Sequence, residues 1–110
     1  MLYISSQDFF DKVSKISRLP REKEKEYAVL MKSGDEGAKQ LIINSYLPFV
    51  AAYTKRHFTY SQPLDIIYRF IATLEAAVDS FNFQQDSRSF ADYLSTKFRQ
   101  DLVNHIIYKG

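Results

Sequence analysis

Five polar residues near the C-terminus recur at the spacing of one helix face: Tyr93, Thr96, Lys97, Gln100 and Asn104. Residues three and four positions apart lie on the same side of an α-helix. The set combines an aromatic ring on which a base can stack, a cation that can pair with phosphate, and two amides that can read base edges. These groups suit a nucleic-acid contact. A plain solvent-facing side has the same period, and the pattern alone favours that simpler interpretation.

A basic group, Lys55, Arg56 and His57, could also contact phosphates, although such a cluster is more often the solvated end of a helix. Metal chemistry has little support. His57 and His105 are far apart, and Asp101 with His105, four residues on, does not make a closed metal site. No glycine-rich phosphate loop, Walker pattern or nucleophile elbow is present. We therefore expect no enzymatic activity, no metal and no cofactor.

Length and composition set further bounds. At 110 residues, with 45% hydrophobic and 25% charged residues, we expect one domain with one modest core. Three glycines and three prolines favour helices over a turn-rich β fold. The absence of cysteine excludes disulfides and thiol catalysis, and fits the cytoplasm. We expect no signal peptide and no membrane span. A formal charge of +2 permits a nucleic-acid partner without requiring one.

The stretch from Pro63 to Phe81 is the helix around which we expect the rest of the chain to pack. Pro63 suits its first turn, and Asp65 lies near the positive end of its dipole. Its apolar residues recur at steps of three and four, the period of an amphipathic helix. They are Leu64, Ile67, Ile71, Leu74, Val78 and Phe81.

Two helices are predicted before residue 33. Ser5 and Asp8 have the spacing of a capping box, which predicts a helix over residues 6–17 that docks on the core. The next helix, over residues 20–32, is dense in alternating charge, which is typical of a solvated face. Gly34 is expected to end it in a left-handed conformation.

A third helix is predicted between Asp35, its N-cap, and residue 57. Pro48 falls inside its apolar pattern, so we expect a bend near Asn44 and Ser45.

The last helix is predicted over residues 90–107. Ser89 and Asp92 form a second capping-box pattern, after a polar loop over residues 82–88. Its predicted buried side consists of Phe90, Leu94, Phe98, Leu102 and Ile106. The sequence therefore predicts an all-α bundle of four or five helices. It forms a single domain over residues 1–110, in which residues 1–18 are a docking segment and residues 19–110 the main part.

Three stretches carry motifs in a characteristic order. The first stretch, residues 19–58, contains a charged helix that ends at Gly-Asp, then Ala-x-x-x-Leu-Ile and a helix with a basic end. The second, residues 64–82, reads LDIIYRFIATLEAAVDSFN. The third, residues 89–106, reads SFADYLSTKFRQDLVNHI. From Leu19 to about Ile107 the chain resembles the second conserved region, with the segment before it, of sigma-70 family transcription initiation factors. The order and spacing of the motifs carry this resemblance, and no single motif does.

The resemblance implies a function for two of the predicted helices. The equivalent of residues 63–81 docks on a coiled coil of the largest subunit of core RNA polymerase, and the equivalent of residues 89–107 captures the unpaired non-template strand of the minus-ten promoter element. By position, the polymerase-binding residues are Asp65, Tyr68, Arg69 and Glu75. The DNA-binding residues are Tyr93, Thr96, Lys97, Gln100 and Asn104, with Lys55 and Arg56 as further phosphate contacts.

The chain also departs from the primary members of the family. Their acidic polymerase contact is Arg69 here, which reverses the charge, and their paired tryptophans, which help to open the duplex, are Thr96 and Lys97. Val103 and Asn104 replace a Thr-Arg pair linked to base reading. The pattern is closer to divergent alternative sigma factors, including the clostridial toxin-gene regulator branch.

The family's helix-turn-helix that reads the minus-thirty-five element does not follow within these 110 residues. We expect either the N-terminal piece of a longer factor or a small protein that borrows promoter contacts from a partner. A competing hypothesis is a degenerate sigma-like interaction module that binds an anti-sigma or co-sigma protein without touching DNA.

Overall fold

The computed structural model describes residues 3–58, 64–84 and 89–107, without the side chains of residues 105–107. In this part of the chain the elements are helices, and no strand occurs. They are α1 (Ser6–Val13), α2 (Arg21–Lys32), α3 (Glu36–Ser45), α4 (Leu47–His57), α5 (Leu64–Ser80), α6 (Phe90–Asp101) and a π-helix, η1 (Leu102–Ile107). The predicted all-α bundle is confirmed. None of the described helices is both long and apolar enough to cross a membrane.

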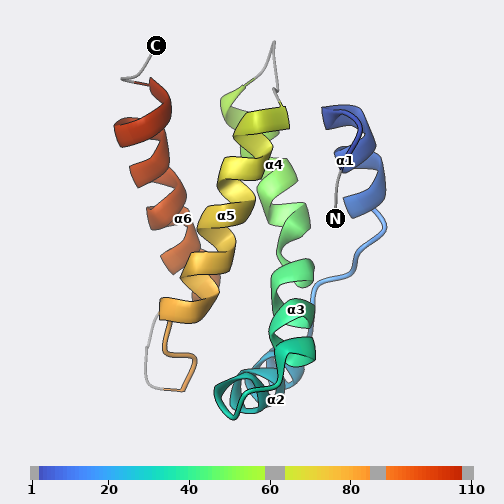
Figure 1. Ribbon diagram of the computed structural model, residues 1–110, viewed down its shortest axis with the longest axis vertical. Coiled ribbons are helices and arrows are strands. Elements are labelled where there is room, and N and C mark those ends of the chain that lie inside the picture. The colour runs from blue at the N-terminus through green and yellow to red at the C-terminus, as the bar shows by residue number, and fades with distance from the viewer. Residues whose placement is uncertain (1–2, 59–63, 85–88, 108–110) are drawn as a thin grey trace.

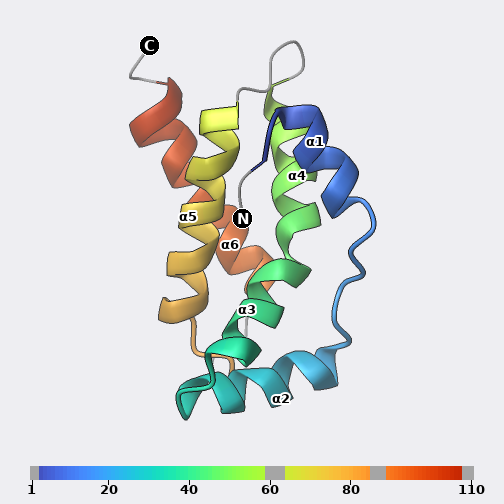
Figure 2. The same cartoon turned by 45° about the vertical axis from the view of Figure 1, so that its right-hand side comes forward.

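The helices form a bundle with one crosswise end. Helices α4, α5 and α6 lie side by side along the long axis, and α3 continues the line of α4 (Figure 1). Helix α2 crosses beneath α3 at the far end, and α1 flanks α4 on the side away from α6 (Figure 2). This arrangement puts α5 next to α6, so that their outer faces are neighbours.

All three predicted N-caps form. The side-chain oxygens of Ser5, Asp35 and Ser89 each accept the N–H of the residue three positions on, at 3.1, 3.0 and 3.1 Å. Each bond satisfies a backbone donor that the first helical turn leaves without a partner. The carboxylate of Asp8 accepts the N–H of Ile4 at 2.9 Å, and this bond is the main reason why the pKa of Asp8 is lowered.

Gly34 ends α2, as predicted. Its φ is 104°, a conformation that costs glycine little. The Gly34 N–H donates to the carbonyl of Met31 at 3.0 Å, and the Asp35 N–H donates to that of Leu30 at 3.0 Å. This pair of bonds is a Schellman motif, which turns the chain from α2 into α3.

Replacing Gly34 by alanine is expected to lower the free energy of unfolding by about 1–2 kcal/mol, because an L-residue is strained in this conformation. An added Cβ would have no neighbouring atom within 4 Å, so the cost arises from the backbone alone. Urea denaturation checks this. The exposed loop variant Ser17→Ala should match the wild type, and equal midpoints for Gly34→Ala and Ser17→Ala would contradict the prediction.

The bend expected near Pro48 is instead an interruption, and this corrects the prediction of one helix from residue 36 to 57. Helix α3 ends at Ser45, and Tyr46 leaves helical geometry with φ −103° and ψ 1°. Pro48 then lies in the first turn of α4, where its missing N–H costs no hydrogen bond. The chain accommodates proline by starting a new helix rather than by bending an old one.

Two other helix ends differ from the prediction. Helix α1 ends at Val13 and not at residue 17, and the Ser14 hydroxyl bonds back to the carbonyl of Asp11 at 2.8 Å. Helix α6 gives way at Leu102 to the wider π-helix η1. The predicted role of Pro63, the packing of Ile106 and the pairing of Asp101 with His105 lie outside the described residues and side chains.

Phe70 is the centre of the core. It is fully buried, and its ring centroid lies 4.9 Å from that of Phe98 and 5.6 Å from that of Tyr53. These contacts join α5 to α6 and α4. The predicted buried side of α6 is confirmed at Phe90, Leu94, Phe98 and Leu102. On α5, the predicted Leu64 and Ile71 are only half-buried.

Candidate functional site

The outer side of α5 carries the four residues that the resemblance assigns to polymerase binding. Asp65, Arg69 and Glu75 are exposed, and Tyr68 is half-buried. Their spacing puts them on the side of α5 opposite the buried Phe70. The structure therefore brings the four side chains onto one surface, which we call the α5 face.

Tyr68 differs from the other three because the N-terminal segment already engages it. The Tyr3 N–H donates to the Tyr68 hydroxyl at 2.7 Å, and the two rings lie 6.2 Å apart. Tyr3 is 8% exposed. The segment before α1 is thus part of the surroundings of the α5 face, which sequence spacing does not indicate.

Tyr93 and Lys97 lie together on the flank of α6 that faces α5. The Tyr93 hydroxyl is 2.7 Å from that of Ser80, and its ring centroid is 5.0 Å from that of Phe81. The Lys97 ammonium lies 5.2 Å from the centre of the Tyr93 ring. At an exposed site such a cation–π contact contributes about 0.5–1 kcal/mol. One face of the aromatic ring is therefore covered by a cation.

The other residues predicted to bind DNA from the last helix are exposed. Thr96, Gln100 and Asn104 all face solvent, and the Thr96 hydroxyl bonds to the carbonyl of Asp92 at 3.2 Å. Asn104 lies in η1, so the α-helical spacing that grouped it with the others does not apply to it. We call Tyr93, Thr96, Lys97 and Gln100 the α6 face.

The predicted basic group does not join the α6 face as a unit. The Lys55 ammonium lies 4.6 Å from the centre of the Phe10 ring, on the side of α1. Arg56 and Arg99 of α6 instead lie near Tyr53. Burial raises the pKa of the Tyr53 phenol, and the charges of these two cations oppose that rise. Lys55 and Arg56 separate because adjacent residues on a helix point in different directions. Arg99 is not among the basic residues predicted from the sequence.

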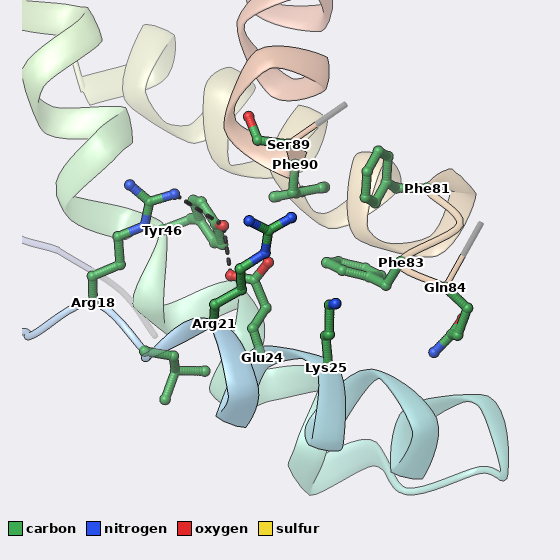
Figure 3. A pocket seen from close by; sticks show the side chains of 11 residues that line it. Arg18, Arg21, Glu24, Lys25, Tyr46, Phe81, Phe83, Gln84, Ser89 and Phe90 are labelled. Atoms are coloured by element: carbon green, nitrogen blue, oxygen red, sulfur yellow. Dashed lines mark hydrogen bonds between the residues drawn. The ribbon is translucent and has the colours of Figure 1, made fainter. Parts of the chain in front are cut away.

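Sequence reasoning also missed a pocket of about 380 Å³ beneath the N-terminus of α6 (Figure 3). It combines cations from the stretch before α2 and its first turns with aromatic rings from the loop after α5 and from α6. Its lining consists of Arg18, Leu19, Arg21, Glu24, Lys25, Tyr46, Phe81, Phe83, Gln84, Ser89 and Phe90. The cations belong to a charged stretch that is typical of a solvated face, and the rings lie far away in sequence, so no local pattern reveals the pocket.

Packed aromatic rings connect the pocket with Tyr93 of the α6 face. Phe90 packs against Phe83 with ring centroids 5.2 Å apart, and Phe81 packs against Phe90 at 5.3 Å. Tyr93 contacts both Phe81 and Phe90, at 5.0 and 6.3 Å. An aromatic run, in which Phe81 and Phe90 are buried, therefore joins the pocket to Tyr93 and Lys97.

Tyr46 forms the inner wall of the pocket and is 2% exposed. Its hydroxyl donates to the Glu24 carboxylate at 2.6 Å and accepts a bond from Arg18 at 3.4 Å (Figure 3). Burial, with the Glu24 hydrogen bond, raises the pKa of Tyr46 to about 12. One buried phenol thus joins α2, the segment before it and the α3–α4 junction.

The protonated Tyr46 phenol is expected to stabilise the fold up to high pH. Its pKa is raised from 10.0 to about 12, so its contribution is fully present below pH 10 and is lost as the pH rises through about 12. At neutral pH, Tyr46→Phe should lower the free energy of unfolding by about 1.5–3 kcal/mol, the range for a hydrogen bond to a charged group. Urea denaturation as a function of pH, read by circular dichroism, measures both effects.

Tyr27→Phe, on α2, is the control for Tyr46→Phe. The Tyr27→Phe variant should lose stability near pH 12 as the wild type does. The Tyr46→Phe variant should lose less stability there, because the ionisation of Tyr46 no longer contributes. A wild-type phenolate titration in which every tyrosine has ionised below pH 11 would contradict the assignment, because the Tyr46 pKa is about 12.

The chain was compared with protein-family models, curated proteins and solved structures. No protein-family model, curated protein or solved structure matches the chain. The sigma-factor resemblance therefore stays a prediction. The structural feature that corresponds to it is the pair of neighbouring polar faces on α5 and α6.

Proposed function

We propose that this chain is a sigma-like transcription-initiation domain. The α5 face binds core RNA polymerase, through the coiled coil of its largest subunit. The α6 face, with the adjoining pocket, binds the unpaired non-template strand of the minus-ten promoter element. One observation carries the proposal: motifs in sigma-factor order fall on two neighbouring helices whose outer faces are polar, accessible and separate.

The chemistry of the α6 face supports single-stranded rather than double-stranded nucleic acid. Aromatic rings are stacking surfaces only for bases that have left the duplex, and each such stack contributes about 1–3 kcal/mol. Tyr93 lies at the end of an aromatic run, with the Lys97 cation beside it. Gln100, one turn further on, is exposed and can hydrogen-bond to a base edge.

The charges of the α5 face are of both signs, which supports a protein partner that also carries both. Asp65, Arg69 and Glu75 are all exposed. A polymerase that accepts this domain then presents an acidic group to Arg69, where primary sigma factors require a basic one. The reversal makes Arg69 a selectivity residue in this proposal.

A pull-down with purified core RNA polymerase tests the polymerase half. Wild-type protein should be retained, Asp65→Ala should reduce retention, and Arg69→Glu should abolish it, because like charges at an interface repel. Lys32→Glu, an equal charge change on the exposed end of α2, is the control and should bind as wild type. Failure of the wild type to bind, or equal binding by all variants, would end the proposal.

The second candidate is the interaction module that binds an anti-sigma or co-sigma protein without DNA. The placement of Lys97 over Tyr93 favours it, because that ring face is already occupied. Replacement of Tyr93, Lys97 and Gln100 by alanine separates the two functions. The triple variant should lose single-stranded minus-ten DNA under the first proposal, and DNA binding should be absent even from the wild type under the second.

A further inference from the structure

A groove of about 940 Å³ lies between α1, the α3–α4 line and α5. Helices α1 and α5 stand on either side of α4, so they form its walls (Figure 2). Its apolar lining comes from all of these elements: Val13, Ile16, Ile43, Leu47 and Ile71. Ile71 and Ile16 are half-buried, so apolar surface stays accessible in the groove.

The two walls carry opposite charges. Lys12 lines the groove from α1, and Glu75 lines it from α5. The Lys12 side chain is 52% exposed, and its ammonium lies 5.8 Å from the centre of the Tyr3 ring. It forms a 3.3 Å ion pair within α1 with Asp8, whose side chain is 22% exposed. Such pairs contribute little, so Lys12 can be shared with a partner. An occupant with an acidic edge toward α1 and a basic edge toward α5 meets both charges.

Helix α1 is a fixed wall of the groove. Phe9 is 0% and Val13 2% exposed, so the inner side of α1 belongs to the core. The bond from the Tyr3 N–H to the Tyr68 hydroxyl, at 2.7 Å, ties the segment before α1 to α5. The groove is therefore formed before any partner arrives, which lowers the entropic cost of binding.

We infer that α1 and α5 together bind one helix of the partner protein. The helix lays an apolar stripe against the groove, with an acidic residue beside Lys12 and a basic residue beside Glu75. Two helical walls around an apolar floor suit the helix-in-groove mode of recognition. The inference rests on the proposed function, since Tyr68 and Glu75 belong to the α5 face, and it adds α1, which lies outside the sigma-factor resemblance.

A charge reversal on α1 tests the inference with core RNA polymerase as the probe. Lys12→Glu should weaken binding of the 110-residue chain about five- to tenfold, because the new carboxylate faces the acidic edge of the partner helix. Lys15→Glu is the matched control: it makes the same change in net charge at an exposed position that does not line the groove. It should bind as wild type, and circular dichroism should give equal melting temperatures.

Equal weakening by Lys12→Glu and Lys15→Glu would overturn the inference, since it would reflect net charge alone. Unchanged binding by Lys12→Glu, with loss by Arg69→Glu, would overturn it while leaving the proposed function intact. If the wild type does not bind polymerase, the proposed function and the inference both fail.

A second readout does not depend on a destabilising change. The chain has no cysteine, so one introduced thiol can be labelled uniquely. A polarity-sensitive fluorophore on Gln40→Cys, which lines the groove, should shift to the blue when polymerase binds. The same label on Glu22→Cys, exposed on α2, should not shift. A blue shift at neither position, under conditions where the complex forms, would overturn the inference.

Discussion

Replacing Phe70 by alanine is expected to lower the free energy of unfolding by about 3–5 kcal/mol, the range for buried Phe-to-Ala changes. Phe70 is fully buried, and its ring meets those of Phe98, Tyr53 and Phe58 at 4.9, 5.6 and 6.5 Å. The cavity would therefore open where α4, α5 and α6 meet. A domain of this size is stable by about 5–15 kcal/mol, so the variant should lose a large fraction of its stability.

Urea denaturation measures this loss, and Leu41→Ala is its control. Leu41 is 47% exposed, so its truncation should change the free energy of unfolding by about 0.5 kcal/mol or less. If Phe70→Ala cost about as little as that, the rings around it would have to collapse into the cavity without strain, and the role of Phe70 as the centre of the core would be wrong.

Replacing Tyr93 by alanine is expected to weaken binding to a single-stranded minus-ten oligonucleotide about 5- to 150-fold, the equivalent of one lost stack of about 1–3 kcal/mol. The ring is the last member of the aromatic run and the one that carries Lys97 above it. Fluorescence anisotropy with a labelled oligonucleotide at fixed salt measures the change. The substitution removes the stacking surface and leaves the cations of the pocket in place.

Tyr93→Phe is the matched control, because it keeps the ring and removes only the hydroxyl that bonds Ser80. It should bind the oligonucleotide nearly as well as wild type. Lys97→Met should reduce the slope of log K against log salt by about 0.7, the value for one phosphate contact on a single strand. Identical affinities for Tyr93→Phe and Tyr93→Ala would remove stacking from the mechanism.

Most of the helices, and the starts of α1, α3 and α6, are predictable from the sequence because they depend on local chemistry. Ser5, Asp35 and Ser89 each cap a helix through a side-chain bond that spans three residues, so sequence spacing is enough to find them. The period of three and four likewise identified the buried side of α6, from Phe90 to Leu102.

The structural features that could not be predicted from the sequence depend on contacts between distant segments. The pocket joins Arg21 to Phe83, which are far apart in the chain, and no periodicity connects them. Pro48 predicted a disturbance of the helix but not its form, because a bend and a new helix start satisfy proline equally well. Adjacency placed Lys55 with Arg56, whereas packing sends Lys55 toward Phe10 of α1.

The interruption at Tyr46 marks the junction between two parts of the bundle. On one side of it lies the α2–α3 hairpin, and on the other lie α4 to α6 (Figure 1). The Tyr46 side chain spans this junction, since its ring centroid lies 4.8 Å from that of Phe90 and its hydroxyl bonds Glu24 at 2.6 Å. One buried side chain therefore fixes the position of the hairpin relative to the start of α6, and the 2.8 Å ion pair between Lys39 of α3 and Asp79 of α5 adds a second link.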